Sequence, residues 1–281
     1  MKKWFGLLLT LALTLALAAC GSSDDNASGG SDSKKEKKEL VVGASNVPHA
    51  EILEQAKPLL EEKGIELEIE TFTDYVLPNK SLDSGDLDAN YFQHIPYFES
   101  QIAENGYEFA NAGGIHIEPI GVYSKKYKSL EELPEGAHII VSSSVADHGR
   151  ILTMLEAKGL IKLKEGIDKT TATAKDIVEN PKNLDFDAQY EAALLPQIYN
   201  NGEGDAVLIN SNYALDAGLN PVKDSIAIEE SDSPYVNIIA VNKGDENKEE
   251  IKALVEVLRS KEIQDWILKE YGGSVVPVKA E

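Results

Sequence analysis

Arg150 is the residue whose type and position point most directly to chemistry. Residues 40–281 contain only two arginines, Arg150 and Arg259, although lysine is frequent. Arg150 lies at the start of a predicted helix, behind the serines at 142–144, where its guanidinium and the free helix amides could together hold a carboxylate. A surface ion pair is the alternative for Arg150. Arg259, on a C-terminal helix rich in charge, is expected to be solvated.

A second candidate region is the segment 90–98, which is dense in aromatic and amide side chains. Alternation along a strand sends its side chains to opposite faces. Tyr91 and Phe98 suit an aromatic core, whereas Gln93 and His94 need polar partners if they are buried. We therefore expect part of this segment to line a cleft.

Motifs for catalysis are missing from the sequence. There is no Gly-x-Ser-x-Gly elbow, no His-Glu-x-x-His and no phosphate-binding glycine loop. The five histidines are scattered, and His116 with Glu118 is the one pair that could be drawn as metal ligands. An exposed pair on a strand surface is the interpretation we favour. The sequence predicts neither an enzyme nor a metal or cofactor site.

The first twenty residues predict the compartment. Lys2 and Lys3 precede an apolar run at 4–16 that is too short to span a bilayer, which is typical of a secretory signal. The run ends in LAAC at 17–20, which resembles the bacterial lipobox, a motif whose cysteine is acylated after cleavage. We predict a signal peptide at 1–19 and a lipid on Cys20. Cys20 is the only cysteine, so no intramolecular disulfide can form.

Composition divides the rest of the chain. Residues 20–39 have almost no apolar side chains beyond the cysteine and predict a flexible tether that holds a globular part on the extracytoplasmic face of the cell membrane. Residues 40–281 are long enough for one large domain or two lobes. The formal net charge of −21 argues against nucleic acid as a partner. No second apolar run predicts a transmembrane helix.

Hydrophobic periodicity predicts an α/β fold. An apolar strand at 40–44, a helical pattern from Pro48 to Gly64 and an alternating strand at 65–69 form a βαβ unit, whose strands should be parallel. Predicted strands and helices continue to alternate along the rest of the chain. Further strands are predicted at 88–92, 116–123, 137–142, 206–209, 225–228 and 236–241. Helices are predicted at 95–105, at 147–158 and, with a break near Ser260, at 248–271.

A short sequence pattern that occurs twice, here called the echo, bears on domain organisation. The Gly-x-x-Asp-Ala turn at 85–89 reappears in outline at 202–206, each time leading into an apolar strand. The echo is either a coincidence in a glycine-rich and aspartate-rich turn or the mark of two similar α/β lobes. Two lobes would form a cleft with strand ends and helix N-termini facing inward, which is where such sheets bind ligands.

Several long motifs resemble the NlpA lipoprotein family over nearly all of residues 40–278. They are PHAEIL at 48–53, TDY at 73–75, DANYFQHIPY at 88–97, HIEP at 116–119, YSKKYKSL at 123–130, ENPKNL at 179–184 and SPYVN at 233–237. The resemblance implies a methionine-binding component of an ABC importer. It also implies a two-lobed periplasmic-binding-protein fold of type II, with the ligand in the cleft between the lobes.

The same resemblance implies roles for particular residues. Arg150 would pair with the ligand carboxylate, and Asn210 and Asn237 would hydrogen-bond its amino and carboxylate ends. The thioether side chain would be enclosed by four aromatic side chains, Tyr75, Phe92, His94 and Tyr97. Lobe one would be residues 40–117 plus 236–281, and lobe two residues 118–235.

One loop departs from the family. Where the family often has an Asn-Asp-Pro-Thr-Asn loop before the arginine, this chain has SSSVADHG at 142–149. The ligand is therefore open between L-methionine, D-methionine and a methionine-containing dipeptide or similar solute. A metal receptor is a more distant alternative, and a secreted hydrolase or adhesin more distant still. The expected partners are the permease, its ATPase and the membrane holding the anchor, and the expected state is a monomer.

Overall fold

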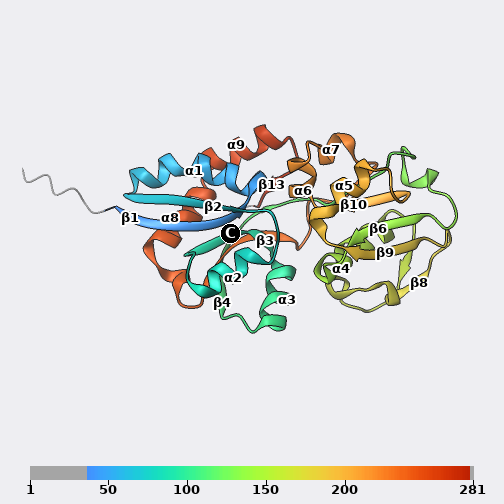
Figure 1. Cartoon of the computed structure of the whole chain (residues 1–281), viewed down its shortest axis with the longest axis horizontal. Coiled ribbons are helices and arrows are strands. Elements are labelled where there is room, and N and C mark those ends of the chain that lie inside the picture. Colours follow the sequence, from blue (N-terminus) through green and yellow to red (C-terminus); the bar gives the residue numbers. More distant parts are fainter. Residues whose placement is uncertain (1–36, 279–281) are drawn as a thin grey trace, which may run out of the picture. The chain divides into compact units, whose positions relative to one another are not determined.

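Two β-sheets, each covered by helices on both faces, organise residues 37–278, the part of the chain that the computed structural model describes (Figure 1). The predicted signal peptide, Cys20 and nearly all of the predicted tether lie outside the described residues. Within residues 37–278 the model contains no helix with the length and apolar character needed to cross a membrane.

The first sheet has six strands in the order β13-β4-β12-β3-β1-β2. β1 and β2 are parallel, as predicted. The structure also shows that β12 runs antiparallel to both β3 and β4. Its strands are β1 (Lys38–Ser45), β2 (Ile65–Phe72), β3 (Ala89–His94), β4 (Phe109–Ile117), β12 (Val236–Asn242) and β13 (Val276–Pro277). The associated helices are η1 (Asn46–Ala50), α1 (Glu51–Glu62), α2 (Leu77–Ser84), α3 (Ile95–Asn105), η6 (Asp245–Asn247), α8 (Glu249–Leu258) and α9 (Lys261–Tyr271).

The second sheet has five strands in the order β11-β5-β10-β6-β9. Its strands are β5 (Gly121–Tyr123), β6 (His138–Ser142), β9 (Asp185–Tyr190), β10 (Ala206–Ile209) and β11 (Ala227–Ile228), and a small hairpin pairs β7 (Lys162–Leu163) with β8 (Ile177–Glu179). The associated helices are η2 (Leu130–Glu132), α4 (Val145–Ala157), η3 (Lys169–Thr171), η4 (Ala174–Asp176), η5 (Ala192–Leu194), α5 (Leu195–Asn200), α6 (Ser211–Asp216) and α7 (Pro221–Asp224).

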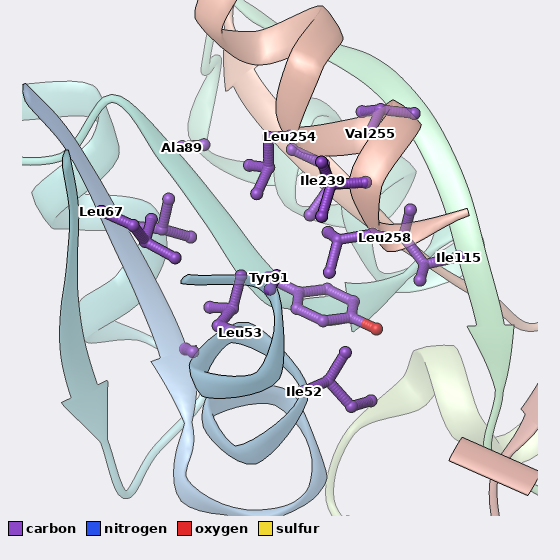
Figure 2. Packing of buried hydrophobic residues seen from close by; sticks show 14 of the residues in the cluster. Ile52, Leu53, Leu67, Ala89, Tyr91, Ile115, Ile239, Leu254, Val255 and Leu258 are labelled. Carbon is purple, nitrogen blue, oxygen red and sulfur yellow. The ribbon is translucent and has the colours of Figure 1, made fainter. Parts of the chain in front are cut away.

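Strand alternation builds a core on each face of the six-stranded sheet. Ile239 of β12 packs with α1 and α8 on one face, and its neighbour Ile238 packs with α2 and α3 on the other. Figure 2 shows the first of these clusters, with the ring of Tyr91 among aliphatic side chains from α1 and α8. Because β3 is buried on both faces, the polar residues along it must find partners inside the protein.

The two echoed turns make equivalent hydrogen bonds. Asp88 accepts from the backbone amide of Val41 at 2.8 Å, and Asp205 accepts from that of His138 at 2.9 Å. In each case the aspartate ties the strand that follows the turn to the neighbouring parallel strand, β3 to β1 and β10 to β6. This shared geometry favours two related units over a coincidence in composition.

The predicted strand at 116–123 is wrong as a single element. β4 ends at Ile117 and β5 begins at Gly121, and the two strands belong to different sheets. Residues 118–120 therefore carry the chain from the first sheet to the second, and residues 229–235 carry it back. Arg259 also differs from expectation, because it is half-buried and donates from Nε to the carbonyl oxygen of Gly114 at 2.8 Å.

Candidate functional site

All seven side chains that the sequence nominates for a ligand line one pocket, which has an empty volume of about 380 Å³ including its opening to solvent. Residues of the six-stranded sheet and its helices contribute one side, and residues 118, 147, 150 and 210–212 contribute the other. The lining side chains are Tyr75, Phe92, Gln93, His94, Tyr97, Glu118, Asp147, Arg150, Asn210, Ser211, Asn212 and Asn237.

Aromatic rings form one wall of the pocket. Phe92 of β3 lies 6.0 Å, centroid to centroid, from both Tyr75 and Tyr97. The hydroxyl of Tyr97 donates to the carbonyl oxygen of Tyr75 at 2.8 Å, and the hydroxyl of Tyr75 donates to Oδ1 of Asn212 at 2.6 Å. These bonds hold the wall closed between β2–α2 on one side and α6 on the other.

His94 joins the two sides through Asp147. Its Nδ1 accepts from the backbone amide of Tyr97 and caps α3, so in the neutral ring Nε2 carries the proton. Nε2 then donates to Oδ1 of Asp147 at 3.1 Å. Burial raises the pKa of Asp147, but the hydrogen bond from His94 and the charge of Arg150 outweigh it and lower the pKa to about 2. Asp147 is thus a buried carboxylate at neutral pH.

Asn210 presents an acceptor to the pocket. It precedes α6, and its Nδ2 donates to Oδ2 of Asp147 at 3.2 Å. Its Oδ1 is buried and has no hydrogen-bond partner. An unpartnered buried oxygen costs free energy, so this atom is suited to accept from a ligand.

Asn237 is oriented the opposite way. Nε2 of His49 lies 3.1 Å from Oδ1 of Asn237 and 3.1 Å from Oε1 of Glu118. Both atoms are acceptors, so Nε2 is protonated and the Asn237 oxygen is engaged. The amide N–H groups of Asn237 are left to face the pocket that this residue lines.

His116 and Glu118 do not form the exposed strand pair that we favoured. Both are buried, and Nε2 of His116 donates to Oε1 of Glu118 at 2.7 Å. His116 is buried because its strand, β4, is paired on both edges within the sheet. The hydroxyl of Tyr91 donates to Nδ1 of His116. Burial lowers the pKa of His116 to about 3 and that of His49 to about 4, so both rings are neutral at pH 7.

This cluster also contains the ligand types of a metal site. The candidate ligand atoms of His49, His116 and Glu118 lie within 4.8 Å of one another. Nε2–H of His116, however, already donates to Oε1 of Glu118, and Nε2–H of His49 donates to Oδ1 of Asn237. Both Nε2 atoms are thus engaged in hydrogen bonds, whereas Nδ1 of His49 is buried and has no hydrogen-bond partner among the described residues. We interpret the cluster as a support for Asn237.

Arg150 is buried, unlike a surface ion pair, and it is already paired. Its Nε donates to Oε2 of Glu229 at 3.0 Å, and Nη2 donates both to that oxygen and to the carbonyl oxygen of Glu118. Nη1 remains, 3.8 Å from Oδ1 of Asp147 on the pocket side. Burial lowers the pKa of Arg150, and the charges of Glu229 and Asp147 more than offset this, so the net shift is upward.

Sequence reasoning missed Glu118, Asp147 and Asn212 as lining residues, and it also missed Glu229, which pairs with Arg150. Asp147 could have been found from its place three residues before Arg150, in the first turn of the predicted helix. Gln93 and Asn90 find their partners in a buried amide network with Asn79. No local signal reveals Glu229, because its partners lie 79 and 109 positions earlier in the chain.

Comparison with known proteins adds the family. The model of the NlpA lipoprotein family matches residues 40–279. The chain belongs to the NlpA lipoprotein family. It is 51% identical to the methionine-binding lipoprotein MetQ of Bacillus subtilis, over 99% of each chain. The predicted family is therefore confirmed.

Solved structures of relatives have the same fold. A nutrient-binding protein from Burkholderia cenocepacia, bound to methionine, is 44% identical with a TM-score of 0.79, and the match covers 85% of this chain and 99% of that one. An ABC transporter periplasmic substrate-binding protein from Coxiella burnetii is 38% identical with a TM-score of 0.79, covering 85% and 100%. The predicted α/β fold of periplasmic binding proteins is confirmed.

Proposed function

We propose that this NlpA-family chain binds methionine in the described pocket and delivers it to an ABC importer. The observation that carries the proposal is the pairing of an aromatic wall with two asparagines whose amides face the pocket in opposite senses. A zwitterion with a long apolar side chain matches that pattern. The names of the relatives, a methionine-binding lipoprotein and a methionine-bound nutrient-binding protein, support the same ligand.

The polar ends of the pocket assign an orientation to the ligand. Nη1 of Arg150 and the amide N–H groups of Asn237 donate to its carboxylate. The free Oδ1 of Asn210, beside the Asp147 carboxylate, accepts from its ammonium group. Each group of the ligand meets a partner of the opposite polarity, as a closed and dry site requires.

The thioether lies against Tyr75, Phe92, His94 and Tyr97. A polarizable sulfur packs well at ring edges and faces. The hydrogen bonds from Tyr97 to Tyr75 and from Tyr75 to Asn212 close this wall. We infer that the thioether side chain of the ligand packs against this wall.

Transport follows from movement of two lobes. We assign lobe one to residues 40–117 plus 236–281 and lobe two to residues 118–235, so that the crossovers 118–120 and 229–235 act as hinges. The lobes close on the ligand, and the closed protein docks as a monomer on a permease coupled to its ATPase. No covalent bond changes, so the protein is a carrier and not an enzyme.

The anchor completes the proposal. Processing at the LAAC sequence would leave a lipidated Cys20 as the new N-terminus, followed by the tether. The binding part would then work at the extracytoplasmic face of the cell membrane. The naming of the Bacillus subtilis relative as a lipoprotein supports this placement.

The direct test of the ligand is mass spectrometry of the small molecule that freshly purified protein releases on denaturation. We expect methionine in an amount close to that of the protein. Stoichiometric release of a different amino acid or of a dipeptide would replace methionine as the ligand. A chiral separation of the released molecule distinguishes the L from the D form.

A further inference from the structure

The two crossovers between the sheets contain no helix or strand of their own. Residues 118–120 join β4 to β5, and residues 229–235 lead from β11 to β12. A change in the angle between the two sheets has to be absorbed in these segments. Side chains that contact both crossovers therefore help to set the angle between the two sheets.

Glu229 is such a side chain. Its Oε2 accepts from the backbone amide of Ile120 in the first crossover at 3.1 Å. Its Oε1 accepts from the hydroxyl of Ser233 in the second crossover at 2.9 Å. One carboxylate thus links the two segments, and its side chain is only 9% exposed.

Arg150, the other member of the ion pair, also contacts both crossovers. Its Nε and Nη2 both donate to Glu229, and Nη2 also donates to the carbonyl oxygen of Glu118 at 2.7 Å. Its guanidinium carbon lies 4.6 Å from the ring centroid of Tyr235, which belongs to the second crossover. The buried ion pair therefore contacts both crossovers through both of its members.

This arrangement leaves Nη1 as the pocket-side nitrogen of a guanidinium that is otherwise held. We propose that Glu229 is a positioning residue for carboxylate recognition: it fixes Nη1 of Arg150 toward the ligand and links that contact to the geometry of both crossovers. The inference rests on the proposed function and extends it to a residue that does not line the ligand pocket.

A simple counter-charge would act in the opposite direction. If Glu229 only neutralised Arg150, its removal would strengthen the attraction between the guanidinium and the ligand carboxylate. If Glu229 positions Arg150, its removal frees the guanidinium and the crossovers and weakens binding. The sign of the change in affinity separates these two roles.

The experiment is calorimetric titration of Glu229→Gln with methionine and with methioninol, which lacks the carboxylate. Glutamine preserves the shape, but its N–H groups cannot replace a carboxylate that accepts from four donors. We expect methionine to bind about 10- to 100-fold more weakly and methioninol to change by less than about 3-fold. The matched control is Glu230→Gln, because Glu230 is exposed and its one ion pair within residues 37–278 is with Lys158; it should leave both affinities unchanged.

Three outcomes overturn the inference. Methionine affinity that is unchanged or increased in Glu229→Gln rules out positioning, and an equal loss for both ligands indicates general damage to the fold. If Glu229→Gln does not fold, Ser233→Ala is the second variant: it removes the bond to Oε1 of Glu229 and the bond that Ser233 Oγ accepts from the backbone amide of Tyr235. It should weaken methionine alone by about 2- to 10-fold; no change there also overturns the inference. A wild-type protein that fails to bind methionine contradicts the proposed function itself.

Discussion

At the scale of single residues, the two asparagines of the pocket illustrate how neighbours decide what a side chain can do. Asn210 and Asn237 have the same chemistry, yet Asp147 engages the amide nitrogen of the first and His49 engages the oxygen of the second. One asparagine is left as an acceptor and the other as a donor. In the proposed binding mode, the direction in which an amino acid binds is therefore set by residues behind the pocket wall.

This orientation predicts a crossed pattern of losses. Asn237→Ala should weaken methionine by about 10-fold and leave methioninol nearly unaffected, because only the carboxylate contact is lost. Asn210→Ala should weaken the binding of both methionine and methioninol, because both ligands retain the ammonium group. The affinity for a third ligand, an analogue of methionine without the ammonium group, should stay unchanged. Titration of each variant with the three ligands decides. If the pattern is reversed, the ligand binds in the opposite direction.

A second prediction at this scale concerns His49 and acid stability. The pKa of His49 is lowered to about 4, so the folded protein binds fewer protons than the unfolded chain between pH 6.5 and 4. The free energy of unfolding should therefore fall as the pH is lowered through this range. At about 1.4 kcal/mol per pKa unit, His49 accounts for about 3 kcal/mol of that fall.

The measurement is denaturant unfolding across this pH range for the wild type and His49→Gln. The variant should be less stable at pH 7 but should show a shallower dependence on pH. His138→Gln changes a more exposed histidine and should retain the wild-type slope. An unchanged slope in His49→Gln would contradict a neutral, buried His49.

At the scale of elements, the sequence located best those elements whose ends carry local signals. The helix at 95–105 and the strand at 206–209 have the predicted bounds, because Pro96 and Gly106 mark one and the turn at 202–206 introduces the other. β9 was missed because its sequence, DFDAQY, is too polar to be recognised as a strand. The break between β4 and β5 was missed because HIEPIGVY reads as continuous, and only the sheets show that Glu118 and Pro119 lie between them.

The residues of the site also fall into those that the sequence could predict and those that it could not. The resemblance to a family nominated seven residues that line one pocket, but it could not nominate their supports. Glu229 and Arg150 come together only in the tertiary structure. The sequence predicted that Arg150 pairs either with a ligand or at the surface, whereas the structure shows it in a buried ion pair with Glu229. Truncation of Arg150 alone would strand the Glu229 charge and destabilise the fold, so the asparagine variants are cleaner tests of the pocket.

A prediction for α4 follows from its close approach to η3. Gly149 lies in α4, and a Cβ there would press against the carbonyl oxygens of Lys169 and Thr170. In an exposed helix, replacement of glycine by alanine stabilises by up to about 1 kcal/mol. Here we expect Gly149→Ala to destabilise by about 1–3 kcal/mol, measured as the free energy of unfolding in denaturant. A gain in stability would mean that α4 and η3 are not packed as described.

At the scale of the whole molecule, we propose that two sheets joined by two crossovers close on a ligand held in the described pocket. Each sheet has its own cores, so the two proposed lobes would keep their internal packing if the crossovers bent. The hydrogen bonds from Tyr75 to Asn212 and from His94 to Asp147 join residues of the two proposed lobes at the pocket. These contacts belong to the closed form that we propose the permease receives.

The anchor gives a prediction for the intact precursor. Cys20→Ser should prevent acylation, so that the protein remains unprocessed or is released in soluble form. Metabolic labelling with a fatty-acid analogue measures this in the producing cell. Persistent label in the variant would show that the lipid is attached elsewhere.

The central claim, that this pocket binds methionine through its side chain as well as its charged ends, is tested most directly by calorimetric titration of ligand-free protein with methionine and with alanine. Both ligands offer the same ammonium and carboxylate. Burial of the methionine side chain is worth about 2–3 kcal/mol, so methionine should bind one to one and roughly 30- to 150-fold more tightly than alanine. Equal affinities, or no binding of methionine, would contradict the account.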